Sequence, residues 1–409
     1  NNKIITKEIK KKTTLSLSKM KSLFLAIMAL ALAASAHRPP LRDLRTRLRR
    51  QTADQNAHHT WAVLVAGSST WSNYRHQADV CHAYQLLHRA GVPDERIVVF
   101  MYDDLANSTS NPYKGKIYND FVTGTSADVD VYAGVPHDYN GKDATADNLL
   151  AVLTGEAPVG GSGKTLKSTA EDNVFFYYDD HGGVGLVAMP YGRRFLDSDF
   201  TKVFSVMSEK KMFKNFILLM QACESGSMFY KQNLPDNVYV STSAPVYESA
   251  YACNYDPRLR TYIASCWPYG WLKEIEAKGA DTTFDHILNV AYYFAVNQSG
   301  TRPCQYGDVD LKRFTLREFF APENSNAAAN DDVHMHHKHH HEHHHGHKRM
   351  ARRAASNIFG DETACPQYDV PYQIAKRNYE HSKSPEDYVE LQRQIEIRKK
   401  VENVLYKIM

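Results

Sequence analysis

Five short apolar runs constrain the fold of this chain more than any other feature. They occupy residues 60–67, 96–101, 173–178, 215–222 and 238–243. Strands that are apolar throughout are buried on both faces, which is typical of parallel strands joined by helices. Apolar residues at helical spacing over 78–87 and a helical pattern over 200–213 supply two such connections. The sequence therefore predicts an α/β fold with a central, mostly parallel sheet and helices on both faces.

Glycine-rich polar sequences follow two of these runs. The third runs into residues 179–183 (DDHGG), which contain His181, and the fourth into residues 221–227 (QACESGS), which contain Cys223 and Gly226. Because ligands of parallel sheets bind beyond the carboxyl ends of the strands, we expect the two side chains to meet there. A thiolate is a nucleophile and an imidazole protonates a leaving amine, which predicts Cys223 and His181 as a catalytic pair. The N–H groups of Gly182 and Cys223 would hold the oxyanion.

Each of these motifs alone has a simpler interpretation. A Cys at a strand end is most often a small buried residue, and a His-Gly-Gly sequence is most often a turn. Because both residues occur together, each followed by a glycine-containing turn, the catalytic interpretation becomes as strong as the simpler one. Chemistry of this kind requires no metal and no cofactor, so neither is expected.

The amino-terminal residues predict targeting rather than fold. Met20 precedes the apolar run 23–34, which ends in the small-x-small pattern of a signal-peptidase site at Ala36. We therefore expect upstream residues and a signal peptide over 1–36, with residues 1–19 ahead of the start methionine, and a short Arg-rich propeptide over 37–58. The run is too short to span a membrane, which takes ~20 apolar residues, so no membrane anchor is expected.

Entry into the secretory pathway, toward a vacuole, a lysosome or the cell exterior, permits glycans and disulfides. Asn107 and Asn297 lie in acceptor sequons, and Cys253 and Cys266 close a short loop rich in turn residues that predicts a disulfide. The net charge of +3 is too small to indicate a nucleic-acid partner.

Four motifs resemble those of legumain, the asparaginyl endopeptidase or vacuolar processing enzyme of the caspase-like clan of cysteine peptidases. They lie at residues 73–79 (NYRHQAD), 180–183 (DHGG), 222–229 (ACESGSMF) and 248–253 (ESAYAC), within a match that runs in order from about residue 61 to about residue 306. The resemblance implies a caspase-like catalytic domain over 59–323. It also implies protein and peptide substrates that are cleaved after Asn, and after Asp at acid pH.

The resemblance also assigns roles to single residues. Asn73 matches the residue that orients the catalytic His, and Asp180 matches its acidic neighbour. The residues that match the specificity pocket are Arg75, His76, Ser241 and Asp256. An Asn side chain offers one carbonyl acceptor and two N–H donors, so such a pocket needs a donor such as Arg75 opposite an acceptor such as Asp256.

Position 221 departs from the family, which usually has Glu two residues before the Cys. Gln221 can still accept a hydrogen bond from a substrate amide, but it lacks the negative charge. A more positive pocket would extend cleavage after Asp to higher pH, and Gln221→Glu would then narrow that range.

Composition changes at Asn324, where a linker over 324–368 begins. It holds ten histidines between His334 and His347. Residues 369–409 resemble the family's activation peptide, which covers the active site of the zymogen, with the helical prodomain that normally follows missing. The resemblance therefore implies that the chain's own C-terminal prosegment inhibits it until cleavage after linker asparagines. The candidate cleavage sites are Asn324, Asn326 and Asn330.

The last part of the prosegment is expected to be helical, with Ser384 as its N-cap and Pro385 in its first turn. Acidic side chains on this helix would lose charge in acid, which suggests a pH-driven release. They are Glu386, Asp387, Glu390, Glu396 and Glu402.

Other functions are compatible with parts of the sequence. The same acyl-enzyme would serve peptide ligation if an amine replaced water. The lipid-anchor transamidase shares the Cys–His pair, but that protein would carry a membrane segment. A His-rich secreted metal-binding protein on an inactive scaffold is a third possibility, although the histidine tract is more simply a low-complexity insertion, and retention of Cys223 and His181 argues against an inactive scaffold.

Overall fold

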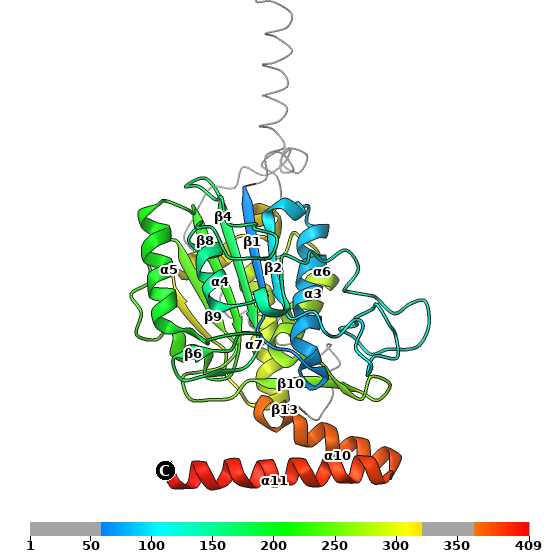
Figure 1. The fold of residues 1–409 in the computed structure, drawn as a ribbon. Helices are drawn as coiled ribbons and strands as arrows, with labels where there is room; N and C mark the ends of the chain where they lie inside the picture. The colour runs from blue at the N-terminus through cyan, green and yellow to red at the C-terminus, as the bar shows by residue number, and fades with distance from the viewer. Residues whose placement is uncertain (1–58, 321–363, 409) are drawn as a thin grey trace, which may run out of the picture. The chain divides into compact units, whose positions relative to one another are not determined.

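A seven-stranded sheet forms the centre of the molecule, with strand order β12-β9-β8-β4-β1-β2-β3 (Figure 1). The computed structural model describes residues 59–320 and 364–408. The strands are β1 (Thr60–Ala66), β2 (Ile97–Met101), β3 (Tyr139–Asn140), β4 (Asn173–Asp179), β8 (Asn215–Gln221), β9 (Val238–Thr242) and β12 (Cys304–Gly307). All neighbours pair in parallel except β12, which is antiparallel to β9. The prediction of a mostly parallel sheet is confirmed.

Helices cover both faces of this sheet. One face packs against α3 (Tyr74–Arg89), α6 (Cys266–Lys278), α7 (Phe284–Ser299) and α8 (Leu316–Phe320), and the other against α4 (Ala146–Leu153) and α5 (Asp197–Glu209). Successive side chains of a strand point to opposite faces. Phe175 and Tyr177 of β4 accordingly pack with Trp271 on the α3 face, whereas Phe176 packs with Phe200 on the α5 face.

The five predicted strands correspond to observed strands whose ends differ by a residue or so. The predicted helix over 200–213 begins earlier, at Asp197, and ends at Glu209. Helix α4 was not predicted, because it has eight residues in a segment rich in turn residues. The Oγ1 atom of Thr145 accepts a hydrogen bond from the backbone N–H of Asn148 and so caps its first turn.

Two three-stranded sheets lie outside the central one. The first has the order β11-β10-β13, with β10 (Tyr251–Asp256), β11 (Thr261–Ser265) and β13 (Cys365–Pro366), and the second contains β5 (Gly182–Gly183), β6 (Leu186–Val187) and β7 (Phe195–Leu196). A disulfide joins Cys253 of β10 to Cys266, the first residue of α6. Residues near the C-terminus therefore complete a sheet that begins at residue 251.

Two helices follow β13, where the sequence predicted one. They are α10 (Val370–Ser382) and α11 (Pro385–Ile408). The backbone N–H of Asp387 donates to Ser384 Oγ at 3.1 Å, so Ser384 occupies the predicted N-cap position of α11. No helix in the described ranges is long and apolar enough to cross a membrane.

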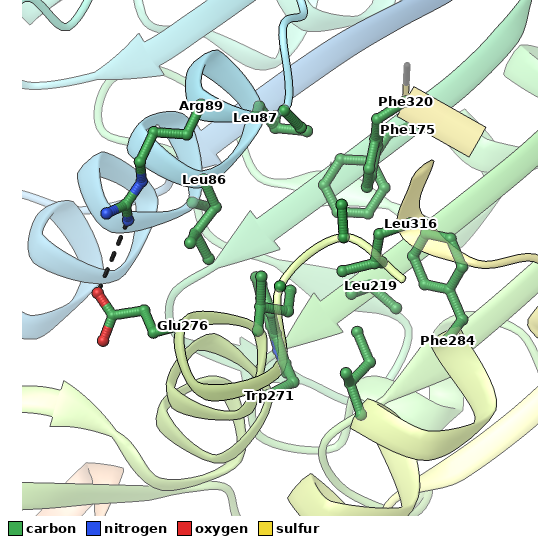
Figure 2. A pocket seen from close by; sticks show the side chains of 16 residues that line it. Leu86, Leu87, Arg89, Phe175, Leu219, Trp271, Glu276, Phe284, Leu316 and Phe320 are labelled. Carbon is green, nitrogen blue, oxygen red and sulfur yellow. Dashed lines mark ion pairs between the residues drawn. The ribbon is translucent and has the colours of Figure 1, made fainter. Parts of the chain in front are cut away.

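An apolar cavity of about 320 Å³ lies between the sheet and the helices of the α3 face. Figure 2 shows the side chains of Phe175, Leu219 and Trp271 around it, with Arg89 and Glu276 to one side. The guanidinium of Arg89 and the carboxylate of Glu276 are 3.7 Å apart. The strands that carry the candidate catalytic residues thus also form a wall of this cavity.

Candidate active site

Cys223 lies two residues beyond the end of β8, where the chain turns sharply. Glu224 adopts a left-handed conformation with φ of 52°, which is uncommon for a residue other than glycine, and a 3-10 helix (Ser225–Met228) follows. The thiol is buried, and the backbone N–H of Ala250 donates to its sulfur at 3.4 Å. Burial, reinforced by the nearby Glu224, raises the pKa of Cys223 to about 11, so the sulfur carries its proton in this form.

His181 lies beyond the end of β4, and Asn73 fixes its ring. The Nε2 atom of His181 is 2.8 Å from Asn73 Oδ1, and the Nδ2 group of Asn73 donates to the carbonyl of Ser69 at 2.9 Å. Because an amide oxygen only accepts, Nε2 carries the hydrogen and Nδ1 is left as the basic nitrogen. Burial lowers the pKa of His181 to about 3, with Asp180 opposing the change, so the imidazole is neutral.

The strand ladder brings these two turns together. Asp179 pairs with Gln221 at the end of the β4–β8 ladder, and the backbone N–H of Asp180 then donates to the carbonyl of Gln221 at 3.0 Å. A Cβ atom at Gly182 would lie 2.2 Å from the carbonyl oxygen of Cys223. Only glycine permits this approach. The residues after β4 and β8 therefore run side by side.

Two residues of the predicted specificity pocket, here called the pocket floor, lie on the α3 side of these strand ends. Arg75 of α3 and Gln221 are both fully buried. Within the described residues, Nε and Nη2 of Arg75 and both amide atoms of Gln221 have no hydrogen-bond partner. Buried polar atoms are nearly always hydrogen-bonded in folded proteins, so unpaired donors and acceptors together indicate a ligand site.

The other predicted pocket residues have partners of their own. His76 Nδ1 is 2.7 Å from both Ser68 Oγ and Asp180 Oδ1. Burial, together with the charge of Arg75, lowers the pKa of His76 well below its usual value. Ser241 Oγ donates to the carbonyl of Cys304 at 3.4 Å.

Asp256 is committed to the backbone rather than to Arg75. Its carboxylate accepts hydrogen bonds from the N–H groups of Val122, Arg258 and Leu259 at 2.8 to 2.9 Å. The hydrogen bond of the Arg75 guanidinium goes to the carbonyl of Ser72 at 3.1 Å. Asp256 thus holds two loops together in this form, whereas the side-chain amide of Gln221 has no partner among the described residues.

Two residues at the site had no role in the sequence analysis. Asp179 was named from sequence only as part of a strand end. The one signal for a role was its place as a polar residue at the end of an apolar strand. Gln367, beyond β13, is fully buried, and its backbone N–H donates to the carbonyl of Ala250 at 3.0 Å. Its side chain opposes the burial-induced lowering of the pKa of both His76 and His181, although neither of its amide atoms has a hydrogen-bond partner within the described residues. No sequence pattern marks this position.

Three candidate metal ligands also cluster here. Ligand atoms of His76, Asp180 and His181 lie within 4.8 Å of one another. Within this cluster, His76 Nδ1 is 2.7 Å from Asp180 Oδ1, and the rings of His76 and His181 pack edge to face with their centroids 5.0 Å apart. Elsewhere, Asn107 and Asn297 are exposed, as glycan acceptors must be. The candidate cleavage sites Asn324, Asn326 and Asn330, the histidine tract and residues 1–58 lie outside the described residues.

A buried Cys and a His at adjacent strand ends, with the His oriented by an Asn, form the arrangement of a thiol-dependent acyl-transfer site. The chain belongs to the Peptidase C13 family, whose model matches residues 60–345.

Mammalian legumains and plant vacuolar-processing enzymes are similar to this chain. Legumain of Mus musculus is 43% identical over 265 residues, which cover 63% of this chain and 58% of that protein. Legumain of Homo sapiens is 42% identical over 265 residues, covering 63% and 59%. Vacuolar-processing enzyme of Vicia sativa is 38% identical over 291 residues, covering 67% and 57%. The chain spans less than two thirds of the length of each of these relatives.

Among solved structures, caspase-1 of Spodoptera frugiperda matches with a TM-score of 0.37 and 10% identity, covering 62% of this chain and 88% of that one. The α/β assignment rests on the sheet topology itself.

Proposed function

We propose that this chain is the precursor of a cysteine endopeptidase that hydrolyses peptide bonds after asparagine, and after aspartate at acid pH. The observation that carries the proposal is the pocket floor, where guanidinium N–H groups of Arg75 and the amide of Gln221 are buried without partners. An asparagine side chain would pair its carbonyl oxygen with Arg75 and its N–H groups with Gln221 Oε1. A pocket of this kind rejects side chains that leave its polar atoms unpaired.

The catalytic steps follow from the roles of His181 and Cys223. Nδ1 of His181 takes the thiol proton as sulfur attacks the substrate carbonyl, and the N–H groups of Gly182 and Cys223 hold the resulting oxyanion. The imidazolium then protonates the leaving amine, which leaves a thioester on Cys223. Water, activated by the again neutral imidazole, hydrolyses the thioester and returns the thiol. Asn73 keeps the Nε2–H hydrogen bond throughout and so maintains the tautomer.

The C-terminal segment is proposed to inhibit this chemistry. Strand β13 pairs antiparallel with β10. The next residue, Gln367, donates its backbone N–H to the carbonyl of Ala250 at 3.0 Å, and the N–H of Ala250 donates to the Cys223 sulfur at 3.4 Å. Two contacts of 2.8 Å hold helices α10 and α11 in place: Tyr255 Oη of β10 donates to Asn378 of α10, and Arg260, in the turn between β10 and β11, pairs with Asp387 of α11. A segment placed in this way excludes a substrate from the strand edge beside Cys223.

Burial of the site by the C-terminal segment also explains the protonation states of Cys223 and His181. Burial raises the pKa of Cys223 to about 11 and lowers that of His181 to about 3, so thiol and imidazole are both uncharged. Departure of residues 365–408 would admit water and bring both pKa values toward their ordinary range. We therefore propose the division made from sequence, a catalytic domain over 59–323 and an inhibitory segment over 369–409. An acidic vacuole or lysosome is the compartment that fits its activation.

Acid alone is expected to weaken the Arg260–Asp387 contact only below about pH 4. A hydrogen bond from Ser382, followed by Arg260, lowers the pKa of Asp387. A carboxylate with a lowered pKa stabilises the folded state above its unfolded pKa of ~3.9 and loses that contribution only as pH falls further. Release at pH 5 would therefore require cleavage in the linker.

The test is hydrolysis of fluorogenic peptides with Asn, Asp or Lys before the scissile bond, from pH 4 to 7, before and after acid treatment. Turnover selective for Asn that disappears in Cys223→Ala supports the proposal. No turnover after removal of residues 321–409 contradicts it.

Gln367→Ala tests the inhibitory contact. This variant should raise activity of the uncleaved chain, whereas Tyr368→Ala, at an exposed neighbouring side chain, should not. Equal activity of both variants and the parent would contradict the assigned role of Gln367.

A further inference from the structure

The apolar cavity on the α3 face of the sheet is large enough to hold a small molecule. Its volume of about 320 Å³ lies at the lower end of the range of ~300–1,000 Å³ that is typical of ligand pockets. Its wall includes Leu86 and Leu87 of α3, Phe175 of β4, Leu219 of β8 and Phe284 of α7 (Figure 2). Folded interiors contain few voids larger than a water molecule, and an apolar void offers water no hydrogen-bond partners. Without an occupant this cavity is therefore a packing defect.

The cavity reaches the surface between the C-terminal ends of α3 and α6. Arg89, the last residue of α3, and Gly279, directly after α6, both line it. The Arg89 side chain is 56% exposed. Gly279 is also exposed, and a Cβ atom built on it would meet nothing within 4 Å among the described residues outside its chain neighbours. A ligand therefore has a route into the cavity past these two residues.

Arg89 places a largely unused cation at this mouth. Its nearest carboxylate, that of Glu276, is 3.7 Å away, beyond hydrogen-bond distance. That carboxylate has closer partners, because Glu276 Oε2 is 2.6 Å from Lys273 Nζ and Oε1 is 3.0 Å from His82 Nε2. Nε of Arg89 donates to the carbonyl of Gln85 at 3.2 Å, whereas its two terminal nitrogens donate no hydrogen bond within residues 59–320 and 364–408. Paired N–H groups of a guanidinium match the two oxygens of a carboxylate.

We infer that this cavity binds a small amphipathic carboxylate, of the class of medium-chain alkyl acids, with the carboxylate on Arg89 and the hydrocarbon inside. The alkyl chain supplies the contacts that the wall of the empty cavity lacks, and its removal from water favours binding. The carboxylate remains at the exposed mouth, where it keeps part of its hydration. The described residues around the cavity include no candidate catalytic or specificity residue, so the inference is independent of the proposed function.

The test measures binding of octanoate, and of octanol as its uncharged counterpart, to the full chain by isothermal titration calorimetry. All proteins carry Cys223→Ala, which prevents self-cleavage, and the buffer is at about pH 6.5, where an alkyl carboxylic acid is ionised. Octanoate should bind saturably and raise the midpoint of thermal unfolding by about 2–4 °C when it is in large excess over its Kd.

Arg89→Gln tests the assignment of the carboxylate. This variant should weaken octanoate binding by about tenfold, because it loses a charge-assisted hydrogen bond, and should change octanol binding by less than about twofold. The matched control is Arg313→Gln, at an exposed arginine that pairs with Asp310, and it should bind octanoate as the parent does. Equal octanoate affinity in Arg89→Gln and the parent would overturn the assignment of a carboxylate ligand.

Ala83→Met tests the place of binding, because Ala83 lines the cavity and the longer side chain would occupy it. Saturable octanoate binding should disappear in this variant. If the variant does not fold, fluorescence decides: octanoate brominated at its terminal carbon should quench the indole of Trp271, which also lines the cavity, and the quenching should be lost in Trp271→Phe. No saturable binding to the parent, or quenching that persists without Trp271, would overturn the inference.

Discussion

The α3 face of the central sheet contains two regions that differ sharply although they lie on the same strands. In the middle of β4 and β8, Phe175 and Leu219 line an apolar cavity of about 320 Å³ (Figure 2). At the ends of the same strands, Asp179 pairs with Gln221, and the side chains of Gln221 and of Arg75 on α3 carry buried polar atoms that lack partners in the described part of the chain. Leu219 and Gln221, which are two positions apart on β8, thus lie in the apolar and the polar region respectively.

The difference shows where this protein is optimised for packing and where for binding. The apolar region contributes to stability by removing hydrocarbon from water, with the cavity as an imperfection. The polar region carries unpaired buried groups that destabilise the fold and are useful only when a ligand pairs them. Substitutions in the two regions should therefore have opposite effects on activity and stability.

Arg75→Met should give the largest effect. It removes the guanidinium donors that we propose for the substrate carbonyl, so kcat/KM for Asn peptides should fall by at least about 10²-fold. Activity should fall more than stability, although removal of the guanidinium leaves the buried carboxylates of Asp179 and Asp180 less well compensated and lowers stability as well. Peptide hydrolysis and thermal unfolding of the same preparation check both parts. A large loss of stability would mean that Arg75 is structural and that the comparison fails.

Leu219→Ala should reverse this pattern. Truncation of a buried Leu costs about 2–5 kcal/mol, and we expect the lower end because Leu219 already borders a cavity. The ratio of kcat/KM for Asn and Asp peptides should stay within about twofold of the parent, since Leu219 faces the apolar region. Urea unfolding gives the stability, with the volume-conserving Leu219→Met as the control. A change in peptide preference at unchanged stability would contradict the separation of the two regions.

The polar region should also make stability depend on pH. The folded-state pKa of Asp79 is raised to about 6 and that of Asp179 is raised well above its usual range. These two carboxylates therefore retain protons that the unfolded chain releases above ~3.9, and their contribution to stability should fall as pH rises from about 4 toward 6. His76 and His181, whose pKa is lowered, contribute in the opposite direction, so the carboxylate effect is read as the difference between variants. Asp179→Asn should flatten this slope, whereas Asp310→Asn should preserve it. Midpoints of urea unfolding at half-unit pH steps provide the measurement, and parallel slopes for the two variants would exclude the carboxylate pair as the cause.

Sequence patterns predicted the strands and turns that are encoded by neighbouring residues in the chain. Apolar runs located β1, β2, β4, β8 and β9, and the glycines after two of them marked the turns that carry His181 and Cys223. The parts that escaped prediction depend on contacts between distant segments. The pairing of Asp179 with Gln221 requires the strand register, and the use of Asp256 by three backbone N–H groups requires two folded loops. The burial of Gln367 requires β13 to join β10, which a two-residue strand does not reveal.

The smallest expected effect distinguishes the cavity from the packed core next to it. Ala83 and Ala78 are both buried on α3, but only Ala83 lines the cavity. A Met side chain is flexible enough to fill an irregular space, so Ala83→Met should raise the unfolding free energy by about 0.5–1 kcal/mol. Ala78→Met has no space to occupy and should lower it by about 1–3 kcal/mol. Urea unfolding of both variants checks this pair. A loss of stability at Ala83 as large as that at Ala78 would mean that the apolar region is as tightly packed as the rest of the core.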